Sequence, residues 1–334
     1  MKIAFFEATD WEREFLQKSL LALEHEFLFF PEELGAKHLH KIAGCEILSV
    51  FIYSKVSEKI ISGCPELKLI TTRSTGFDHI DMEACRKRKI SVSNVPFYGE
   101  NTVAEHTFAL ILSLSRNVHK AYVRTIKGDF SLTGLKGFDL KGKTLGVIGA
   151  GHIGLHVVKM AKGFGMEVLA FDLNKSEFME EVLNFRYVPL DELLGRSDII
   201  TLHAPYNKKT HHMINRNNIQ KIKRGALLIN TARGGLVDTH ALVQALDEGI
   251  LSGAGLDALE GEDLIKEEKQ ILASQFPQDK LETLVKNHIL LHRENVVITP
   301  HVAFYSQEAL QRILETTLEN IAGFTSGKPA NIVA

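Results

Sequence analysis

Apolar and polar residues alternate along the first 96 positions in a way that predicts short strands separated by helices. Five β-rich runs occur there, each short enough for a buried strand: KIAFFEA, EFLFFP, EILSVFI, KLITTRS and ISVSNVP. The first, third and fourth intervals between them carry amphipathic helical sequence: EREFLQKSLLALE, SEKIISGC and DMEACRKRK. Strands that alternate with helices predict a parallel sheet covered by helices on both faces.

A longer helical pattern follows over residues 102–127, with no Gly or Pro before Gly128. Its apolar residues, which include Phe108, Ile111 and Tyr122, cover more than one stripe of the helix. A helix that is apolar on most sides is buried either in its own core or against a partner. The pattern leaves both possibilities open, and the second of them is a dimer interface.

A second series of strands and helices begins at Lys143. The runs that predict its strands are TLGVIGAG, EVLAFD, SDIITLHAP, GALLINTA, SGAGLDAL and NVVITPH. The last helical pattern, over residues 306–324, has no strand after it and could pack back on the first series. We therefore expect two α/β domains, of which the first is discontinuous.

Composition narrows the class of protein without naming an activity. The 334 residues are 45% apolar and 24% charged, which is typical of a soluble globular protein of about two domains. The 39 basic and 41 acidic residues nearly cancel, so nothing favours binding to nucleic acid or to an anionic membrane.

The cysteines and the apolar runs exclude further classes. Cys45, Cys64 and Cys85 are odd in number and lack the spacing of metal ligands, so we expect no disulfide framework, no metal site and a reducing cytoplasm. The longest apolar run, 103–114, is interrupted by polar residues and is too short to cross a bilayer.

A glycine motif after the strand TLGVI indicates a dinucleotide cofactor. Gly149, Gly151 and Gly154 form a G-x-G-x-x-G that opens a helix, and Asp172 ends the next strand eighteen residues beyond Gly154. This context predicts a tight turn at Gly149, close approach of the pyrophosphate at Gly151 and helix–strand packing at Gly154. Asp172 would bind ribose hydroxyls, and no arginine stands beside it, so NAD is favoured over NADP.

Three residues that follow apolar strands suit the reduction of a 2-keto acid. Such a reaction needs a cation for the carboxylate, an acid for the developing alkoxide and a group that orients this acid. Arg233 in LINTARGG, Glu262 in GLDALEGED and His301 in VVITPHVA offer these functions. Because ligands bind beyond the carboxyl ends of parallel strands, we expect the three to converge. Taken singly each is weak evidence, and we interpret His38, His40 and the pair 211–212 as structural or surface residues.

Ordered motifs over nearly the whole chain resemble the D-2-hydroxyacid dehydrogenase family. They are TGFDHIDM, NVPFYGENTVAEH, GVIGAGHIG, LHAP, NTARGGLVD, GLDALEGE and TPHVA. The resemblance implies two doubly wound parallel-sheet domains with a cleft between them, in a homodimer. Residues 1–98 and 300–334 would form a flavodoxin-like substrate domain. Residues 99–299 would form a Rossmann NAD-binding domain that includes the dimerisation helix.

The resemblance also assigns residues. The family's catalytic Arg, Glu and His fall on Arg233, Glu262 and His301. It implies that the backbone of Thr75 and Gly76 binds the substrate carboxylate, and that Phe51 and Tyr98 surround the substrate side chain. On the cofactor side it implies roles, besides those of the three glycines, for Val103, His152, Ile153, Asp172, His203, Ala204, Pro205, Thr231, Ala232 and Asp257.

Two features resemble the lactate-forming members of the family. One is the long insert within residues 260–294, and the other is the pair Phe51 and Tyr98, which suits a small apolar substituent. Lactate enzymes often carry Tyr at the position of Phe51, so its absence could favour a bulkier 2-keto acid. Hydroxypyruvate, phosphoglycerate and aromatic 2-keto acids remain alternatives, although no Lys or Arg is evident for a phosphate near Phe51, Thr75 or Tyr98. A non-catalytic NAD-sensing interaction protein is the alternative from another class.

Overall fold

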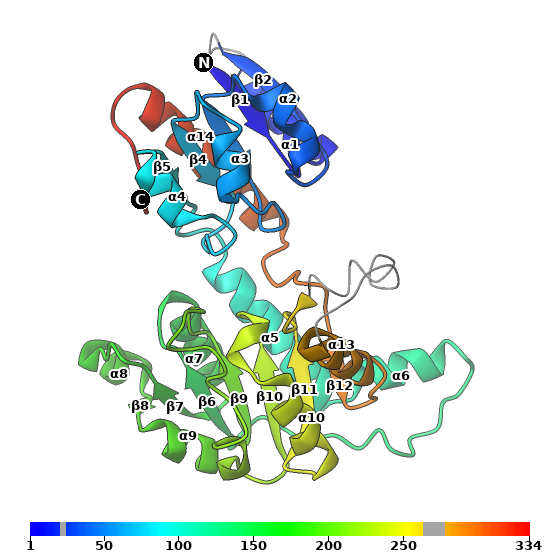
Figure 1. Cartoon of the computed structure of the whole chain (residues 1–334). Coiled ribbons are helices and arrows are strands. Elements are labelled where there is room, and N and C mark those ends of the chain that lie inside the picture. The colour runs from blue at the N-terminus through cyan, green and yellow to red at the C-terminus, as the bar shows by residue number, and fades with distance from the viewer. Residues whose placement is uncertain (21–24, 263–277) are drawn as a thin grey trace. The chain divides into compact units, whose positions relative to one another are not determined.

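The computed structural model describes residues 1–20, 25–262 and 278–334, and its contacts divide them into two compact units. The first unit comprises residues 1–98 and 306–334, and the second comprises residues 99–305. Each unit contains one parallel sheet with helices on both faces (Figure 1). Much of the insert that we singled out in the sequence, residues 263–277, lies outside the described residues.

The first unit has a five-stranded sheet in the order β2-β1-β3-β4-β5, with all neighbours parallel. Its strands are β1 (Lys2–Phe5), β2 (Glu26–Phe29), β3 (Ile47–Val50), β4 (Leu69–Thr72) and β5 (Ser91–Ser93). Its helices are α1 (Asp10–Leu20), η1 (Ala36–His38), α2 (Leu39–Ile42), α3 (Glu58–Ser62), α4 (Met82–Lys87) and α14 (Gln307–Thr325). This strand order confirms the expected flavodoxin-like fold. The short helices η1 and α2 lie in the one interval for which the pattern predicted none.

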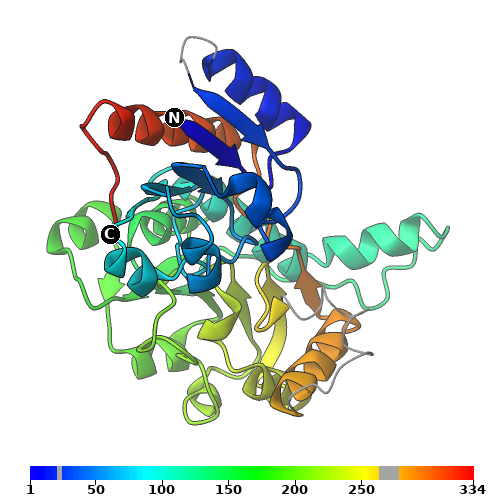
Figure 2. The same cartoon turned by 45° about the horizontal axis from the view of Figure 1, so that its top comes forward.

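The last helix completes the core of the first unit. Leu314 and Ile321 of α14 are fully buried against Ile3, Phe5 and Leu69 of the sheet. Figure 2 shows this helix, in red, beside the strands of the sheet. A separate apolar cluster covers the opposite face and includes all three cysteines, which are free thiols.

The second unit has a seven-stranded parallel sheet in the order β12-β11-β10-β9-β6-β7-β8. Its strands are β6 (Thr144–Ile148), β7 (Glu167–Phe171), β8 (Arg186–Tyr187), β9 (Ile199–Leu202), β10 (Ala226–Asn230), β11 (Leu251–Leu256) and β12 (Val296–Ile298). Its helices are α5 (Glu100–Ser115), α6 (Val118–Thr125), α7 (His152–Gly163), α8 (Glu177–Leu183), α9 (Leu190–Arg196), η2 (Ile219–Lys221), η3 (Gly234–Leu236), α10 (Thr239–Asp247) and α13 (Gln278–Leu291). The order reverses between β6 and β9, as in a Rossmann fold.

The prediction of a single helix over residues 102–127 is wrong. The segment forms α5 and α6, which are separated at Asn117 by a left-handed backbone with φ of 51°. Asparagine tolerates this conformation, and its side-chain amide lies within hydrogen-bonding distance of the carbonyls of Leu135 and Lys136 in the returning chain. Helix α5 is buried against the sheet, whereas α6 buries no side chain and projects from its unit in both views (Figures 1 and 2).

The second boundary between the units differs from the expected one. We expected residues 300–305 in the first unit, but they belong to the second. The physical reason is Asp257, whose carboxylate accepts hydrogen bonds from the backbone N–H groups of Val302 and Ala303 at 2.9 and 2.8 Å. Its carbonyl oxygen accepts the N–H of His301 at 2.9 Å.

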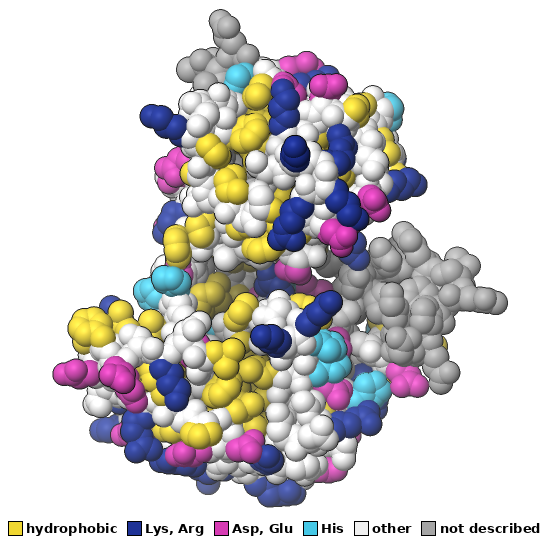
Figure 3. All heavy atoms as spheres, turned by 60° about the vertical axis from the view of Figure 1, so that its left-hand side comes forward, with side chains coloured by type: hydrophobic (Ala, Val, Ile, Leu, Met, Phe, Trp, Pro, Cys, Tyr) yellow, Lys and Arg dark blue, Asp and Glu magenta, His cyan; other side chains and the backbone are white. Residues whose placement is uncertain are grey.

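The surface carries both signs of charge. Figure 3 shows basic and acidic side chains on the visible face of each unit, with hydrophobic groups between them. Among the helices in the described ranges, none has the length and hydrophobicity that a membrane span requires.

Candidate active site

Three neighbouring strands of the second unit place the expected chemical residues at one edge of its sheet. Arg233 follows β10, Glu262 follows β11 and His301 follows β12, and these strands are adjacent and parallel. The carboxyl ends of parallel strands meet at the same edge, so the three residues emerge on the same side of the sheet.

His301 and Glu262 form a direct pair. The Nδ1 atom of His301 lies 2.9 Å from Oε1 of Glu262. An ionised carboxylate accepts hydrogen bonds only, so Nδ1 carries the hydrogen and Nε2 is the nitrogen that can exchange a proton. His301 also has a left-handed backbone, with φ of 55°, which is uncommon outside glycine. Sparsely populated backbone conformations of this kind are enriched at functional sites.

Asp257 holds the loop that carries His301. Only 1% of this residue is exposed, and its carboxylate also accepts the hydroxyl hydrogen of Thr299 at 2.5 Å. His106, on α5, places Nε2 3.0 Å from the Thr299 hydroxyl and 3.5 Å from Asp257. His106 ends the VAEH motif, and no role was predicted for it from the sequence. The only signal was a histidine on a helix with many apolar residues.

Arg233 is oriented by the end of its own strand. The buried Asn230 donates to the carbonyl of Arg233 at 2.9 Å and accepts the N–H of Ala232 at 3.1 Å. A Cβ added to Gly234 would lie 2.0 Å from the backbone of Leu259, so this loop packs closely against the segment that leads to Glu262. Asn230 was not predicted as a site residue, although a polar residue at the end of the apolar run LLIN was a signal.

The glycine motif has the geometry of a dinucleotide-binding turn. Gly149 has φ of +94°, and a Cβ there would lie 2.6 Å from the backbone nitrogen of Ala204. A Cβ on Gly154 would lie 2.0 Å from the carbonyl oxygen of Gly149. Gly151, at the N-cap of α7, has no atom within 4 Å of its Cβ position. The first and third glycines are therefore required by packing, whereas the second faces open space.

Several groups near this turn suit a bound nucleotide. His152 and Ile153 lie in the first turn of α7, where backbone N–H groups lack intrahelical acceptors and attract phosphate. Asp172 follows β7, and its carboxylate accepts the N–H of Ala150 at 2.7 Å, so it stands directly beside the turn. The expected position of this acidic residue relative to the glycines is thus observed.

The next strands bring further expected cofactor residues to the same edge. His203, Ala204 and Pro205 follow β9, and the His203 N–H donates to Ile148, the last residue of β6. The ring nitrogen Nδ1 of His203 is buried and has no hydrogen-bond partner among the described residues. Burial lowers the pKa of this imidazole to about 3, so the ring is neutral near pH 7. Its other nitrogen, Nε2, lies 2.9 Å from the Thr201 hydroxyl, so the unpartnered Nδ1 beside the glycine turn fits a ligand with polar atoms.

Helix α5 packs against β10, β11 and β12, and one of its residues reaches the segment after β10. The Thr107 hydroxyl donates its hydrogen to the carbonyl of Val103 and therefore accepts the hydroxyl hydrogen of Thr231 at 3.0 Å. Val103 and Thr231, both expected to contact the cofactor, are therefore connected through one buried threonine, and Ala232 is the residue after Thr231.

The remaining residues expected to bind the keto acid, besides Arg233 and His301, belong to the first unit. Thr75 and Gly76 follow β4: the Thr75 carbonyl accepts a hydrogen bond from Asn94 at 2.8 Å, and the Gly76 carbonyl accepts one from Ser74 at 2.7 Å. Phe51 follows β3, the strand adjacent to β4. The Tyr98 carbonyl accepts from Arg312 of α14 at 2.6 Å. Within this unit, Phe51, Thr75 and Gly76 lie at one edge of the sheet. Tyr98 is the last residue of the unit's first segment, residues 1–98.

Comparisons with known proteins identify one family. The model of the protein family described as D-isomer specific 2-hydroxyacid dehydrogenase, NAD binding domain, matches residues 108–303. A 2-hydroxyacid dehydrogenase homolog of Haemophilus influenzae is 37% identical over 98% of this chain and 97% of its own. The D-lactate dehydrogenase of Escherichia coli is 35% identical over 98% of both chains.

A solved structure shows the same fold over the full length. The D-lactate dehydrogenase of Aquifex aeolicus, complexed with NAD and lactic acid, superposes with a TM-score of 0.88 at 39% identity. It covers 99% of this chain and 98% of its own.

Proposed function

This chain belongs to the D-2-hydroxyacid dehydrogenase family, and we propose that it uses NADH to reduce pyruvate reversibly to D-lactate. The observation that carries the proposal is the pair of His301 and Glu262, held 2.9 Å apart beside the buried Asp257. A positioned imidazole paired with a carboxylate is what a carbonyl reductase needs for proton transfer.

The residues of the second unit divide the chemistry between them. His301, when protonated, gives the proton on Nε2 to the carbonyl oxygen, and Glu262 stabilises the imidazolium through Nδ1. Arg233 binds the substrate carboxylate, for which its planar guanidinium has matching geometry. In the reverse direction neutral His301 accepts the hydroxyl proton of D-lactate.

The cofactor site is formed by the glycine turn. Gly151 admits the pyrophosphate, the first turn of α7 donates N–H groups to it, and Asp172 accepts from the ribose hydroxyls. NADH bound there supplies the hydride that the keto carbon receives. His203, Thr231 and Ala232 would shape the part of the site near the strand ends.

The substrate residues are proposed from the first unit. The Thr75–Gly76 backbone would bind the carboxylate, while Phe51 and Tyr98 would contact the substrate side chain. Phe51 lacks the hydroxyl that lactate enzymes often carry there. A second candidate is therefore a dehydrogenase for a bulkier apolar 2-keto acid, with the same proton-transfer residues.

The setting of the enzyme is also proposed. The exposed apolar side chains of α6 and the segment after it support a homodimer. The three free, buried cysteines support a reducing cytoplasm.

The decisive experiment follows NADH absorbance with pyruvate, phenylpyruvate, 2-ketoisocaproate, hydroxypyruvate and glyoxylate in turn. The highest kcat/KM with pyruvate, and D-lactate as the product, is expected. The highest value with 2-ketoisocaproate or phenylpyruvate would support the second candidate. NADH binding without turnover of any keto acid would contradict both and favour a non-catalytic NAD-binding protein.

A further inference from the structure

The residue that follows the first strand of the first unit has an unusual backbone. Glu7 lies two residues after the end of β1, with φ of 52°. Glutamate has no side-chain feature that favours the left-handed region, so such a conformation persists only where its surroundings fix it. The N–H of Glu7 donates to the carbonyl of Glu32 at 3.1 Å.

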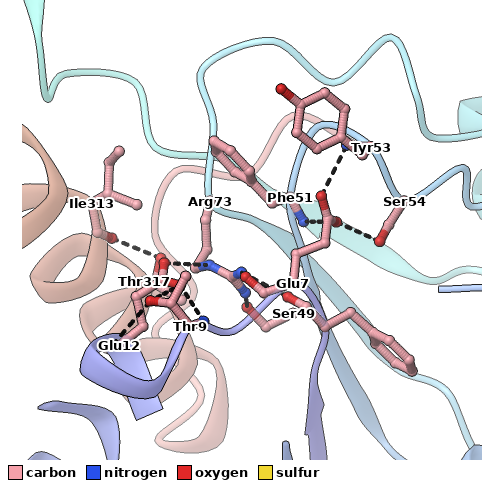
Figure 4. A network of polar contacts seen from close by, with 11 residues as sticks. Glu7, Thr9, Glu12, Ser49, Phe51, Tyr53, Ser54, Arg73, Ile313 and Thr317 are labelled. Carbon is pink, nitrogen blue, oxygen red and sulfur yellow. Dashed lines mark hydrogen bonds and ion pairs between the residues drawn. The ribbon is translucent and has the colours of Figure 1, made fainter. Parts of the chain in front are cut away.

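The side chain of Glu7 holds a turn that is 44 residues away in the sequence. One carboxylate oxygen accepts the N–H of Phe51 at 3.0 Å and the hydroxyl of Ser54. The other accepts the N–H of Tyr53 at 3.1 Å. Figure 4 shows the carboxylate of Glu7 directed into this turn, with Phe51, Tyr53 and Ser54 around it.

Arg73 fixes Glu7 from its backbone side. This arginine is 1% exposed, and its Nη2 donates to the carbonyls of Phe6 and Glu7 at 2.7 and 2.9 Å. Its Nη1 donates to the Ser49 hydroxyl at 3.1 Å. The guanidinium carbon also lies 6.0 Å from the ring centre of Phe51, within the range of a cation–π contact (Figure 4).

The charge of Arg73 is paired with a second glutamate, Glu12. Glu12 of α1 places a carboxylate oxygen 3.7 Å from the Arg73 Nε atom. Removing one member of a buried ion pair leaves the charge of the other uncompensated, which strongly destabilises the fold. Arg73 is therefore a rigid support, and the position of Glu7 depends on it.

The turn that Glu7 holds carries two aromatic rings. Phe51 and Tyr53 lie with their ring centres 6.4 Å apart and their planes at 90°. We propose that Glu7, held by Arg73, is a positioning residue that sets this aromatic pair and thereby selects the side chain of the 2-keto acid. The inference rests on the proposed function, because it adds a determinant of substrate choice to that reaction.

Holding the turn requires a carboxylate, because three hydrogen-bond donors, on Phe51, Tyr53 and Ser54, point at Glu7. A glutamine would present one oxygen and one NH₂ group, so an N–H of the turn would face another donor. Without this partly buried acceptor a donor of the turn loses its hydrogen-bond partner, which favours movement of the turn. The proton transfer at His301 involves none of these atoms, so kcat for the preferred substrate should change little.

The test compares Glu7→Gln and Glu7→Ala with Glu46→Gln. Glu46 is a matched control because it immediately precedes β3, at the opposite end from Phe51, and its carboxylate accepts from Lys68 at 2.7 Å. Each variant is assayed for kcat and KM with pyruvate and with 2-ketoisocaproate, for NADH affinity, and for amide hydrogen exchange of residues 51–54.

We expect Glu7→Gln to change the ratio of kcat/KM between the two keto acids by about fivefold or more, mainly through KM. Exchange at residues 51–54 should accelerate, while NADH affinity and the Glu46→Gln ratio stay at wild-type values. If Glu7→Ala fails to fold, the glutamine variant decides. An unchanged ratio, or equal losses for both substrates, would overturn the inference.

Failure of the proposed function gives a different result. A wild-type protein that turns over neither keto acid would overturn the proposed function and the selectivity that depends on it. The positioning of the turn by Glu7 would then be judged by exchange alone, and unchanged exchange in Glu7→Gln would overturn that as well.

Discussion

His301 occupies a backbone conformation that few histidines adopt, and two neighbours, Asp257 and Glu262, hold it there. Its N–H donates to Asp257, the next two N–H groups donate to the Asp257 carboxylate, and its ring pairs with Glu262. This arrangement fixes both the ring orientation and the tautomer before any substrate arrives.

Replacement of His301 tests its assignment as the acid and base. His301→Ala should lower kcat by about 10²–10⁴-fold, the usual contribution of a positioned proton donor, while NADH affinity stays within twofold. The exposed His40 of the first unit provides a control, and His40→Ala should retain the wild-type kcat. Steady-state kinetics with a fluorescence titration of NADH measures both, and a near-normal kcat for His301→Ala would refute the assignment.

His203 gives the protein a defined pH dependence of stability. Burial lowers its pKa to about 3, whereas an unfolded histidine titrates near 6.5. Between these values the unfolded chain binds a proton that the folded chain excludes, so this contribution is constant above pH 6.5 and is lost progressively below it. Between pH 6.5 and pH 5 the loss should approach about 2 kcal/mol.

The comparison variant for that measurement is His203→Gln, which cannot titrate. Urea unfolding at several pH values should show a smaller decline of the unfolding free energy below pH 6.5 in the variant than in the wild-type protein. Parallel declines would mean that His203 is protonated in the folded state.

At the scale of elements, the sequence predicted the long strands well, but it did not predict the shortest strand or the interruption of the long helix. Apolar runs such as TLGVI and ALLIN are continuous because both faces of a parallel sheet are buried, and all the named runs became strands. The two-residue strand β8 and the break at Asn117 carry no periodic signal. They arise from contacts with chain that lies elsewhere, such as the carbonyl of Leu135.

In the candidate site, too, features with a local sequence signal could be predicted, and features that depend on distant contacts could not. Residues that belong to a sequence motif could be predicted, because the neighbouring residues indicate their function. Examples are the three glycines, Asp172 and His301. Glu7, Arg73 and His106 could not be predicted, because their functions consist of hydrogen bonds to strands and loops that are distant in the sequence.

The glycine turn permits a sharp test of two neighbouring substitutions. Gly154→Ala places a methyl group 2.0 Å from a carbonyl oxygen, so it should destabilise the second unit by roughly 1–3 kcal/mol. Gly151→Ala meets no protein atom and should keep stability within about 1 kcal/mol of wild type, yet weaken NADH binding about tenfold or more. Thermal unfolding and NADH titration separate the two effects, and intact NADH affinity in a folded Gly151→Ala would contradict the proposed pyrophosphate position.

At the scale of the whole molecule, α6 and the segment after it leave a large apolar surface uncovered. Val118, Tyr122, Val123, Ile126, Phe130 and Leu132 are 46–84% exposed. A surface of this kind on a projecting element is typical of an interface between subunits.

The double variant Tyr122→Glu with Ile126→Glu should convert the expected dimer into a monomer without loss of folding, because neither side chain contributes to a core. Phe178→Glu on α8 is a matched control, since Phe178 is exposed to 67%, close to the 66% of Tyr122. Light scattering at micromolar concentration measures the mass, and a monomeric wild-type protein would refute the dimer.

The return of the chain to its first sheet has a consequence for synthesis on the ribosome. Residues 331–334 hydrogen-bond to β5, and α14 covers the face of β4, so the first unit is completed by segments made after the entire second unit. The second unit is continuous and can fold as soon as it emerges. The nascent first unit must wait with the α14-facing side of its sheet uncovered, and during that interval it is the part of the molecule most in need of a chaperone.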